Sequence, residues 1–130
     1  MVTGISIVAV PVDDIDEAVH FFCEALGMEK RKDLTGTDRY AGERYVEVAP
    51  PGSPVALSPY TDYDRAPGRA TIGEYSRLVL RVADVHHAYT ELSARGVPFE
   101  TEPFDLPHGT FAAIRDPWDN VFGLTDSTTF

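Results

Sequence analysis

A few carboxylate and imidazole side chains are placed where they could act as acids or bases. Glu47 lies in an alternating run, residues 43–49, and could act as a lone base if its face of the predicted strand points inward. His108 lies in a turn at residues 106–109, and loop residues beside a binding site often carry function. A turn histidine with no partner is the alternative for His108. These two residues are the only candidates for catalysis, since no Cys-His pair, Ser-His-acid triad or glycine-rich phosphate loop accompanies them.

Arginine side chains provide a second kind of chemistry, the binding of anions. Arg77 and Arg81 alternate with apolar residues in a predicted strand at 75–82, so both guanidinium groups lie on one face. They would either bind an anionic small molecule through forked hydrogen bonds or form cross-strand ion pairs with glutamates. The candidate glutamates are Glu43, Glu47 and Glu74. A choice between Arg44 and Tyr45 also stays open. They are neighbours in a predicted strand, so only one of the two side chains can face inward.

The other histidines and the single cysteine indicate no metal or nucleophile site. His20, His86 and His87 fall on the polar sides of two predicted helices, where a histidine needs no special explanation. Cys23 excludes a disulfide within the chain, and its helical spacing with Phe22 and Leu26 is typical of a small buried hydrophobic residue.

The composition limits the class of protein. A chain of 130 residues is of the size of one domain, predicted over 1–130. The net charge of −10 repels nucleic acid and anionic lipid, so neither is an expected partner. No apolar stretch is long enough to span a bilayer and no signal peptide is evident, which predicts a cytoplasmic protein.

These side chains must be positioned by an internal repeat. Residues 10–28 and 82–97 follow the same order: an apolar run, a Val-x-Asp, a segment with helical apolar spacing, and a glycine before a new extended run. Either Asp13 or Asp14 caps the first helix and Asp84 the second, and Gly27 and Gly96 end them. Two β-α-β-β-β modules result, at about 1–58 and about 75–130, joined by a linker at about 59–74. The predicted strands are 4–10, 29–34, 43–49, 54–58, 75–82, 98–102, 110–115 and 121–125.

Several short segments resemble the vicinal oxygen chelate superfamily, which includes glyoxalase I, bleomycin-resistance proteins and extradiol dioxygenases. The resemblance rests on Asp14, Phe21-Phe22, Leu26-Gly27-Met28, Gly96-Val97-Pro98-Phe99, Arg115-Asp116-Pro117 and Asn120. Residues 44–52 are similar to a bacterial branch of that superfamily whose members mostly lack an assigned activity. Trp118-Asp119 replaces the Asp-Gly that is usual in the last turn, so Asp119 or Asn120 is expected to take the positive φ.

The resemblance implies an α+β fold in which two tandem βαβββ modules form curled sheets around a cleft, with the helices outside. It also implies a homodimer, because small members commonly complete the cleft with a second chain. Metal-using members place His, Gln or Glu at four inward points, which fall here on Ile7, near Ala56 or Ser58, on Arg77 and on Gly123. None of these residues is a ligand for a divalent ion. No metal or other cofactor is therefore predicted.

Our hypothesis from the sequence is a metal-free protein that binds a small, anionic or aromatic molecule in that cleft, as bleomycin-resistance proteins sequester a drug. The predicted binding residues are Ile7, Arg44, Ser58, Tyr75, Arg77, Arg81, Phe111 and Gly123. One alternative is an enzyme of the same superfamily: a metal-dependent lyase or dioxygenase, or a metal-free isomerase that uses Glu47 or His108 as base. Another is a protein whose dimer surface matters and whose cleft is vestigial.

Overall fold

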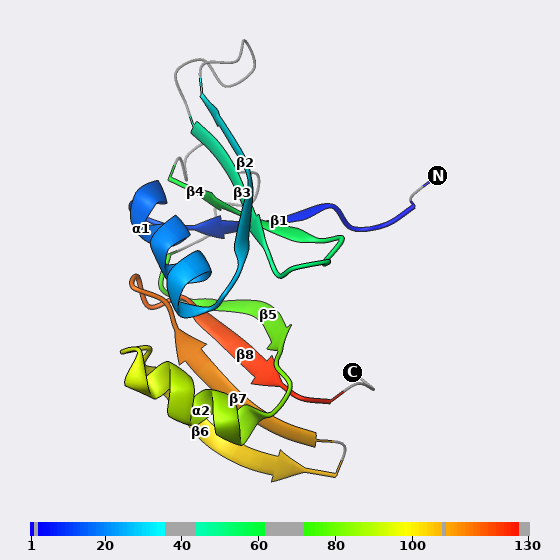
Figure 1. The fold of residues 1–130 in the computed structure, drawn as a ribbon, viewed down its shortest axis with the longest axis vertical. Coiled ribbons are helices and arrows are strands. Elements are labelled where there is room, and N and C mark those ends of the chain that lie inside the picture. Colours follow the sequence, from blue (N-terminus) through cyan, green and yellow to red (C-terminus); the bar gives the residue numbers. More distant parts are fainter. Residues whose placement is uncertain (2, 36–43, 62–71, 108, 128–130) are drawn as a thin grey trace. The chain divides into compact units, whose positions relative to one another are not determined.

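The computed structural model describes residues 1, 3–35, 44–61, 72–107 and 109–127 (Figure 1). The chain forms two compact units, Met1–Thr71 and Ile72–Phe130. Each unit contains one four-stranded mixed sheet and one helical segment, in the order β-α-β-β-β. This order confirms the predicted α+β fold with two repeated modules. No helix in the described part of the chain is long and apolar enough to cross a membrane.

The two sheets have the same topology. In unit 1 the sheet order is β1-β4-β3-β2, and in unit 2 it is β5-β8-β7-β6. The first and last strands of each unit pair in parallel, and the other pairs are antiparallel. The elements of unit 1 are β1 (Ile7–Pro11), α1 (Ile15–His20), η1 (Phe21–Ala25), β2 (Glu29–Thr35), β3 (Arg44–Ala49) and β4 (Ala56–Tyr60). Those of unit 2 are β5 (Tyr75–Arg81), α2 (Val85–Ala94), β6 (Phe99–Leu106), β7 (Gly109–Arg115) and β8 (Val121–Thr125).

Both helices begin at the predicted aspartates. Asp14, and not Asp13, caps α1 by accepting a hydrogen bond from the backbone N–H of Glu17 at 2.8 Å. Asp84 caps α2 in the same way, with the N–H of His87 at 3.0 Å. The first helix departs from the prediction after His20, where a wider π-helical turn, η1, replaces the α-helix. The N–H of Leu26 therefore bonds to the carbonyl of Phe21, five residues earlier, at 3.2 Å.

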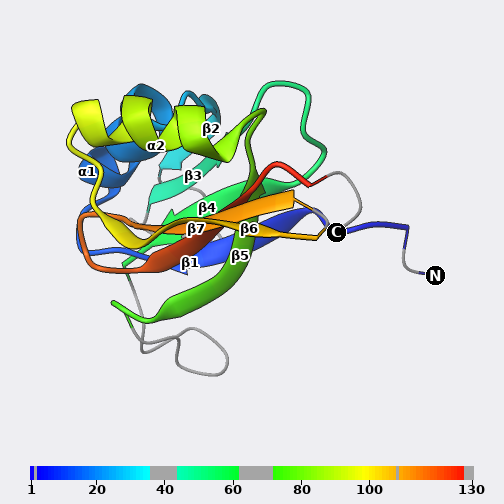
Figure 2. The same ribbon diagram turned by 90° about the horizontal axis from the view of Figure 1, so that it is seen from below.

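Each helix covers one face of its own sheet (Figure 2). The core between helix and sheet contains the most deeply buried apolar side chains, among them Val10, Phe22, Val46 and Val48 in unit 1 and Val85, Ile114, Phe122 and Leu124 in unit 2. Because side chains alternate along a strand, their neighbours lie on the opposite side, which we call the open face of each sheet. The open faces carry several exposed apolar side chains, including Ile7, Leu34, Val79 and Phe104. Their exposure distinguishes these faces from the core.

Three strands differ from the prediction by more than one residue at an end. β1 starts at Ile7 and not at residue 4, and β4 runs two residues further than predicted, through the buried Pro59, because Pro59 and Tyr60 continue the parallel register with β1. β6 continues to Leu106 because it pairs with β7 as far as Gly109. A register shift between Thr101 and Phe104 accommodates Pro103 inside this strand.

Candidate functional site

The open face of unit 2 carries one row of residues that crosses all of its strands. The register pairs Arg81 on β5 with Thr125 on β8, Thr125 with Phe111 on β7, and Phe111 with Phe104 on β6. Residues paired in this way point to the same side of a sheet. The row therefore runs from an exposed guanidinium group at one edge to an exposed aromatic ring at the other.

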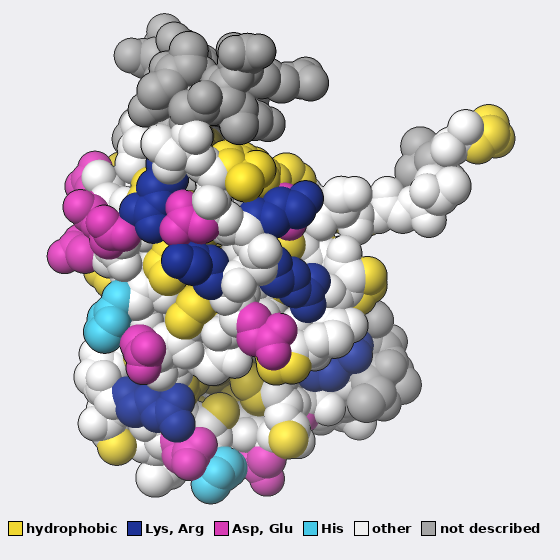
Figure 3. All heavy atoms as spheres, turned by 45° about the horizontal axis from the view of Figure 1, so that its top comes forward, with side chains coloured by type: hydrophobic (Ala, Val, Ile, Leu, Met, Phe, Trp, Pro, Cys, Tyr) yellow, Lys and Arg dark blue, Asp and Glu magenta, His cyan; other side chains and the backbone are white. Residues whose placement is uncertain are grey.

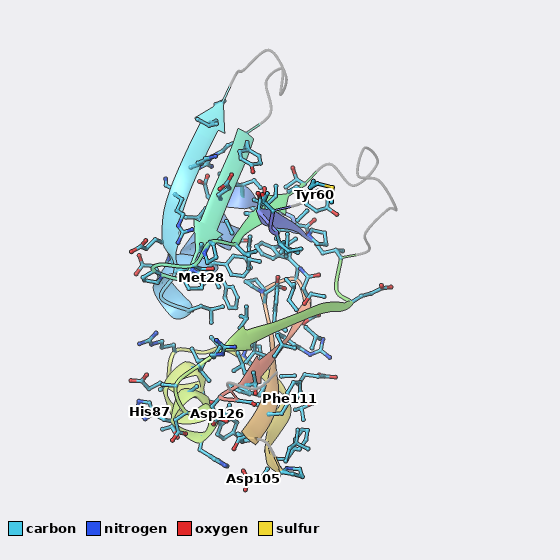
Figure 4. All side chains as sticks on the ribbon, turned by 90° about the vertical axis from the view of Figure 1, so that its right-hand side faces the viewer. Met28, Tyr60, His87, Asp105, Phe111 and Asp126 are labelled. Carbon is cyan, nitrogen blue, oxygen red and sulfur yellow. The ribbon has the colours of Figure 1, made fainter. Side chains whose placement is uncertain are left out.

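Gly123 provides the space in which the ring of Phe111 lies. A Cβ atom added at Gly123 would be 2.9 Å from Cε2 and Cζ of Phe111 and 3.2 Å from Cγ2 of Val79. The ring thus leans over β8 toward β5, across the backbone of the glycine (Phe111 is labelled in Figure 4). A side chain at residue 123 would displace it. The glycine is needed here for close approach, since its φ angle is not in the left-handed region.

The aromatic end of this row is open to solvent. Phe104 is 42% exposed and Val79 is 41% exposed, and the ring centroids of Phe104 and Phe111 are 5.6 Å apart. Such tilted aromatic pairs present ring surface on which a further flat ring system can pack. Arg81, at the other end, forms no ion pair with any residue in the described ranges. The face can therefore offer an apolar floor and an exposed cation to one small molecule.

The open face of unit 1 is more polar. Lys32 on β2 pairs with Glu47 on β3, and the pairing of Val48 with Leu57 sets Glu47 opposite Ser58 on β4. Ser58 in turn pairs with Ala9 on β1. We call Lys32, Glu47 and Ser58 the polar row. Its carboxylate accepts a hydrogen bond from the hydroxyl of Tyr45 at 2.7 Å and lies 3.4 Å from Nζ of Lys32.

Arg44 lies on the helix side of the same sheet. Its guanidinium group donates two hydrogen bonds of 2.8 Å to Asp33 and one of 2.6 Å to Asp16 on α1. The hydrogen bonds from Arg44 and Lys30 hold the pKa of Asp33 far below its usual range. Basic and acidic side chains lie next to one another on the face shown in Figure 3. Arg44 is thus separated from the open face, and Tyr45 is the neighbour that points there.

A buried carboxylate organises the turn between β7 and β8. Asp116 is 2% exposed, and its Oδ1 accepts hydrogen bonds from the N–H of Trp118 at 3.0 Å and of Asn120 at 2.9 Å. Its Oδ2 accepts a third, from the side-chain amide of Asn120, at 2.8 Å. Burial raises the pKa of Asp116, although these hydrogen bonds act in the opposite direction. Asp119 takes the positive φ, 65°, that a glycine would usually take.

A second carboxylate joins the end of β8 to its neighbours. Asp126 accepts hydrogen bonds from the N–H of Val85 at 3.1 Å and of Thr110 at 2.9 Å (Figure 4). It therefore links the start of α2 to β7. Both backbone bonds lower the pKa of Asp126.

The structure brings together some of the residues predicted from the sequence. Arg81, Phe111 and Gly123 share the open face of unit 2, and Ile7 and Ser58 share that of unit 1 together with Glu47. Their role in binding stays a prediction. The side chains of Tyr75 and Arg77, and the whole of His108, lie outside the described residues.

The sequence reasoning missed Phe104, Lys32 and the hydroxyl of Tyr45. Phe104 lies beyond the predicted end of its strand, so strand parity did not place it on any face. Tyr45 and Glu47 are two residues apart in a predicted strand, so the sequence places both side chains on one face. The sequence did not show which face of that strand points inward.

The repeat identifies the residues at the four inward points. The N–H of Val12 donates to the carbonyl of Tyr60 at 2.9 Å, and the N–H of Val82 donates to that of Thr125, also at 2.9 Å. Tyr60 therefore corresponds to Thr125. On β4 and β8 the residues two positions earlier are Ser58 and Gly123, so Ser58, and not Ala56, corresponds to Gly123. By the same alignment, Ile7 on β1 corresponds to Arg77 on β5.

These four residues do not fit a transition metal or another divalent ion. An isoleucine, a serine hydroxyl, a guanidinium and a glycine supply no imidazole, carboxylate or thiolate donor. Elsewhere in the part of the chain that the structure describes, no three His, Cys, Asp or Glu side chains converge on one point. We derive no chemical step through a metal.

Comparisons with known proteins agree with this architecture. A model of the Glyoxalase/Bleomycin resistance protein/Dioxygenase superfamily matches residues 4–124. The uncharacterized protein YetH of Bacillus subtilis (strain 168) is 29% identical over 128 residues, which cover 97% of this chain and 100% of that protein. The crystal structure of TnmS3, an antibiotic binding protein from Streptomyces sp. CB03234, has a TM-score of 0.80 and 29% identity, with 98% of each chain covered. The structure of a superfamily member from Sphaerobacter thermophilus DSM 20745 has a TM-score of 0.84 and 27% identity, with 95% of this chain and 97% of that chain covered.

Proposed function

The chain belongs to the glyoxalase/bleomycin resistance protein/dioxygenase superfamily, and from that premise we propose that it is a metal-free protein that binds a small aromatic molecule with an acidic group. The observation that carries the proposal is the row on the open face of unit 2. Phe104 and Phe111 provide ring surface, Gly123 lets the Phe111 ring lie against the sheet, and Arg81 offers an exposed cation. Ligand sites are typically apolar with a few placed polar groups, as this face is.

Similarity to an antibiotic binding protein supports a small-molecule ligand. TnmS3 matches the chain over nearly its full length, so the proposed role is to bind and sequester an antibiotic or a related aromatic metabolite. The lack of metal donors at the four inward points supports a role without metal chemistry. The backbones of Arg81 and Phe111 lie two strands apart, roughly 10 Å across the sheet, and the Phe111 ring leans toward β5, which suits a carboxylate carried on a fused ring system.

We also propose that the binding protein is a homodimer. Each sheet has one face covered by its helix and one that carries exposed apolar residues, such as Ile7, which is 42% exposed, and Leu34, which is 44% exposed. Apolar side chains in such numbers on a sheet face are typical of surfaces that a partner covers. Light scattering should then give a mass of about twice the 14.3 kDa of one chain.

The experiment that tests the proposal is a thermal-shift screen of antibiotics and aromatic carboxylates, followed by calorimetry. We use 2-naphthoate as the defined probe, because its two fused rings and carboxylate match the ends of the row. Arg81→Met should weaken 2-naphthoate binding about tenfold, since one charge-assisted hydrogen-bonded pair is lost. The control Arg95→Met removes the same charge from the exposed end of α2 and should bind as the parent does. Equal affinities for all three proteins would contradict the role of Arg81.

Two further measurements separate binding from catalysis. Metal analysis of protein purified without chelator should find less than stoichiometric transition metal, and a full equivalent would favour the lyase or dioxygenase alternative. Turnover of a compound that does not stabilise the protein would favour an isomerase, with Glu47 as the base that the structure describes on an open face.

A further inference from the structure

The hydroxyl group of Thr125 lies inside the row that crosses the open face of unit 2. Thr125 pairs with Arg81 on one side and with Phe111 on the other, so its side chain points to the same face as theirs. The alternation along β8 agrees, because Phe122 and Leu124 are buried in the core. Thr125 itself is 4% exposed. A nearly buried polar group therefore lies between the exposed guanidinium and the aromatic part of this face.

This hydroxyl group has a proton that the described residues do not use. Its oxygen accepts a hydrogen bond from the backbone N–H of Ser127 at 3.1 Å. Among the residues that the structure describes, none accepts a hydrogen bond from the hydroxyl in return. A hydroxyl can donate as well as accept, and a buried donor without an acceptor costs free energy. The group therefore favours a ligand atom that accepts a hydrogen bond.

The fold itself does not require two donors at this place. Thr125 corresponds to Tyr60 in the internal repeat. Each of them pairs in parallel with a residue on the first strand of its own unit, Thr125 with Arg81 and Tyr60 with Pro11. A proline side chain has no hydrogen-bond donor. The neighbouring guanidinium and hydroxyl groups are thus a property of this face of unit 2 and not of the shared architecture.

We propose that Arg81 and Thr125 together bind a carboxylate group of the ligand, an inference that rests on the proposed function. One carboxylate oxygen would accept from the guanidinium of Arg81 and the other from the hydroxyl of Thr125. The two residues are in register on adjacent strands, which lie about 5 Å apart, so one carboxylate can reach both. The Arg81 side chain is exposed and can turn aside to admit the carboxylate to Thr125. Hydrogen bonds to an ionised oxygen are short and strong.

This pair of donors narrows the class of ligand. A carboxylate has two acceptor oxygens and a negative charge, which match two donors of which one is a cation. An ester lacks the charge, and a phenol has a single oxygen. The inferred ligand is therefore an aromatic carboxylate, and not a phenol or an ester.

The test compares 2-naphthoate with 2-methylnaphthalene, which has a methyl group in place of the carboxylate. Thr125→Val removes the hydroxyl and keeps a side chain of similar shape. It should weaken 2-naphthoate binding about tenfold, as expected for one hydrogen bond to a charged group, and leave the affinity for 2-methylnaphthalene unchanged. Thr125→Ser keeps the hydroxyl and should bind 2-naphthoate within about threefold of the parent. The matched control Thr90→Val removes a hydroxyl from the exposed side of α2 and should change neither affinity.

The outcomes separate the inference from the function on which it rests. Parental affinity of Thr125→Val for 2-naphthoate would overturn the role of Thr125 and leave the proposed function standing. Equal losses for both compounds would mean that the hydroxyl only holds the N–H of Ser127, and would also overturn the inference. Tighter binding of methyl 2-naphthoate than of 2-naphthoate would do the same. No binding of 2-naphthoate by the parent protein would refute the proposed function and the inference together.

A crystal structure of the parent protein with 2-naphthoate decides the question if Thr125→Val does not fold, which thermal melting checks. Oγ1 of Thr125 and a guanidinium nitrogen of Arg81 should each lie about 3 Å from a carboxylate oxygen. A carboxylate bound away from Thr125 would overturn the inference.

Discussion

Replacing Gly123 by alanine tests the close packing of Phe111 on the open face of unit 2. The new Cβ would lie 2.9 Å from two atoms of the Phe111 ring, closer than carbon atoms approach in proteins, so the ring must move. Inserting one methyl group into a packed site costs about 1–3 kcal/mol, and an alanine in a strand regains about 0.5–1 kcal/mol over glycine. Because Phe111 is only half-buried and can swing outward, we expect a cost in the lower half of that range, about 1.5–2 kcal/mol, before the gain from alanine is subtracted. The free energy of unfolding should fall by about 1 kcal/mol.

The effect on binding should be larger than the effect on stability. A displaced Phe111 ring would no longer lie against β8, so the affinity for 2-naphthoate should fall about tenfold, as when one stacking contact worth about 1.4 kcal/mol is lost. Urea unfolding and calorimetry measure the two quantities. Gly4→Ala is the matched control, because no atom lies within 4 Å of its added Cβ, and it should change neither.

A second substitution shows whether the clash is the cause. Phe111→Leu in the Gly123→Ala background removes the ring atoms that the new Cβ meets, so the double variant should be more stable than the sum of the two single changes predicts. Additive stability changes, or a Gly123→Ala variant that keeps both the parental stability and the parental affinity, would refute this account of Gly123.

Three other predictions concern single side chains. Asp116→Ala should lower the free energy of unfolding by about 2–3 kcal/mol in urea titration, because it leaves three N–H donors, of which the two from Asn120 are buried, without their acceptor; a loss below 1 kcal/mol would contradict this. The lowered pKa of Asp126 means that its contribution to stability is present above the ordinary aspartate pKa of about 3.9 and is lost as the pH falls through its folded value. Asp126→Asn should therefore flatten the decline of the melting temperature in acid, and an unchanged acid profile would argue against its two backbone bonds. Burial, followed by the nearby Glu24, raises the pKa of the Cys23 thiol, so iodoacetamide should modify it more slowly in the folded protein than in the urea-unfolded chain, as followed by mass spectrometry.

Much of the fold follows from short signals in the sequence. Asp14 and Asp84 have the capping side chains that start the helices, and Gly27 and Gly96 adopt positive φ angles of 75° and 85° where the helical segments end. β8 has the predicted limits because its apolar residues lie between clear turn residues. The limits of β4 and β6 were wrong because each contains a proline that usually ends a strand, and here pairing with a neighbouring strand outweighs that preference.

The candidate site was less accessible from the sequence. Strand parity correctly grouped Arg81 with Val79, but it cannot say how far a side chain leans along the sheet, so the packing of Phe111 on Gly123 was not predictable. The partners of Arg44 come from β2 and α1, and only the three-dimensional arrangement shows that Asp33 and Asp16 meet it. Short sequence patterns therefore predict the helices and strands, whereas the contacts between side chains of different elements are seen only in the structure.

The matching register of the two sheets has a consequence for engineering. Since the residues that face the helices and those on the opposite side alternate along each strand, the latter can be exchanged between the halves without repacking the interior. Placing the Lys32 and Glu47 side chains at positions 101 and 113 would give the open face of unit 2 the ion pair of unit 1, while Gly123 keeps the space in which the Phe111 ring lies. A duplicated scaffold of this kind can acquire new ligand preferences in one copy while the other keeps its own.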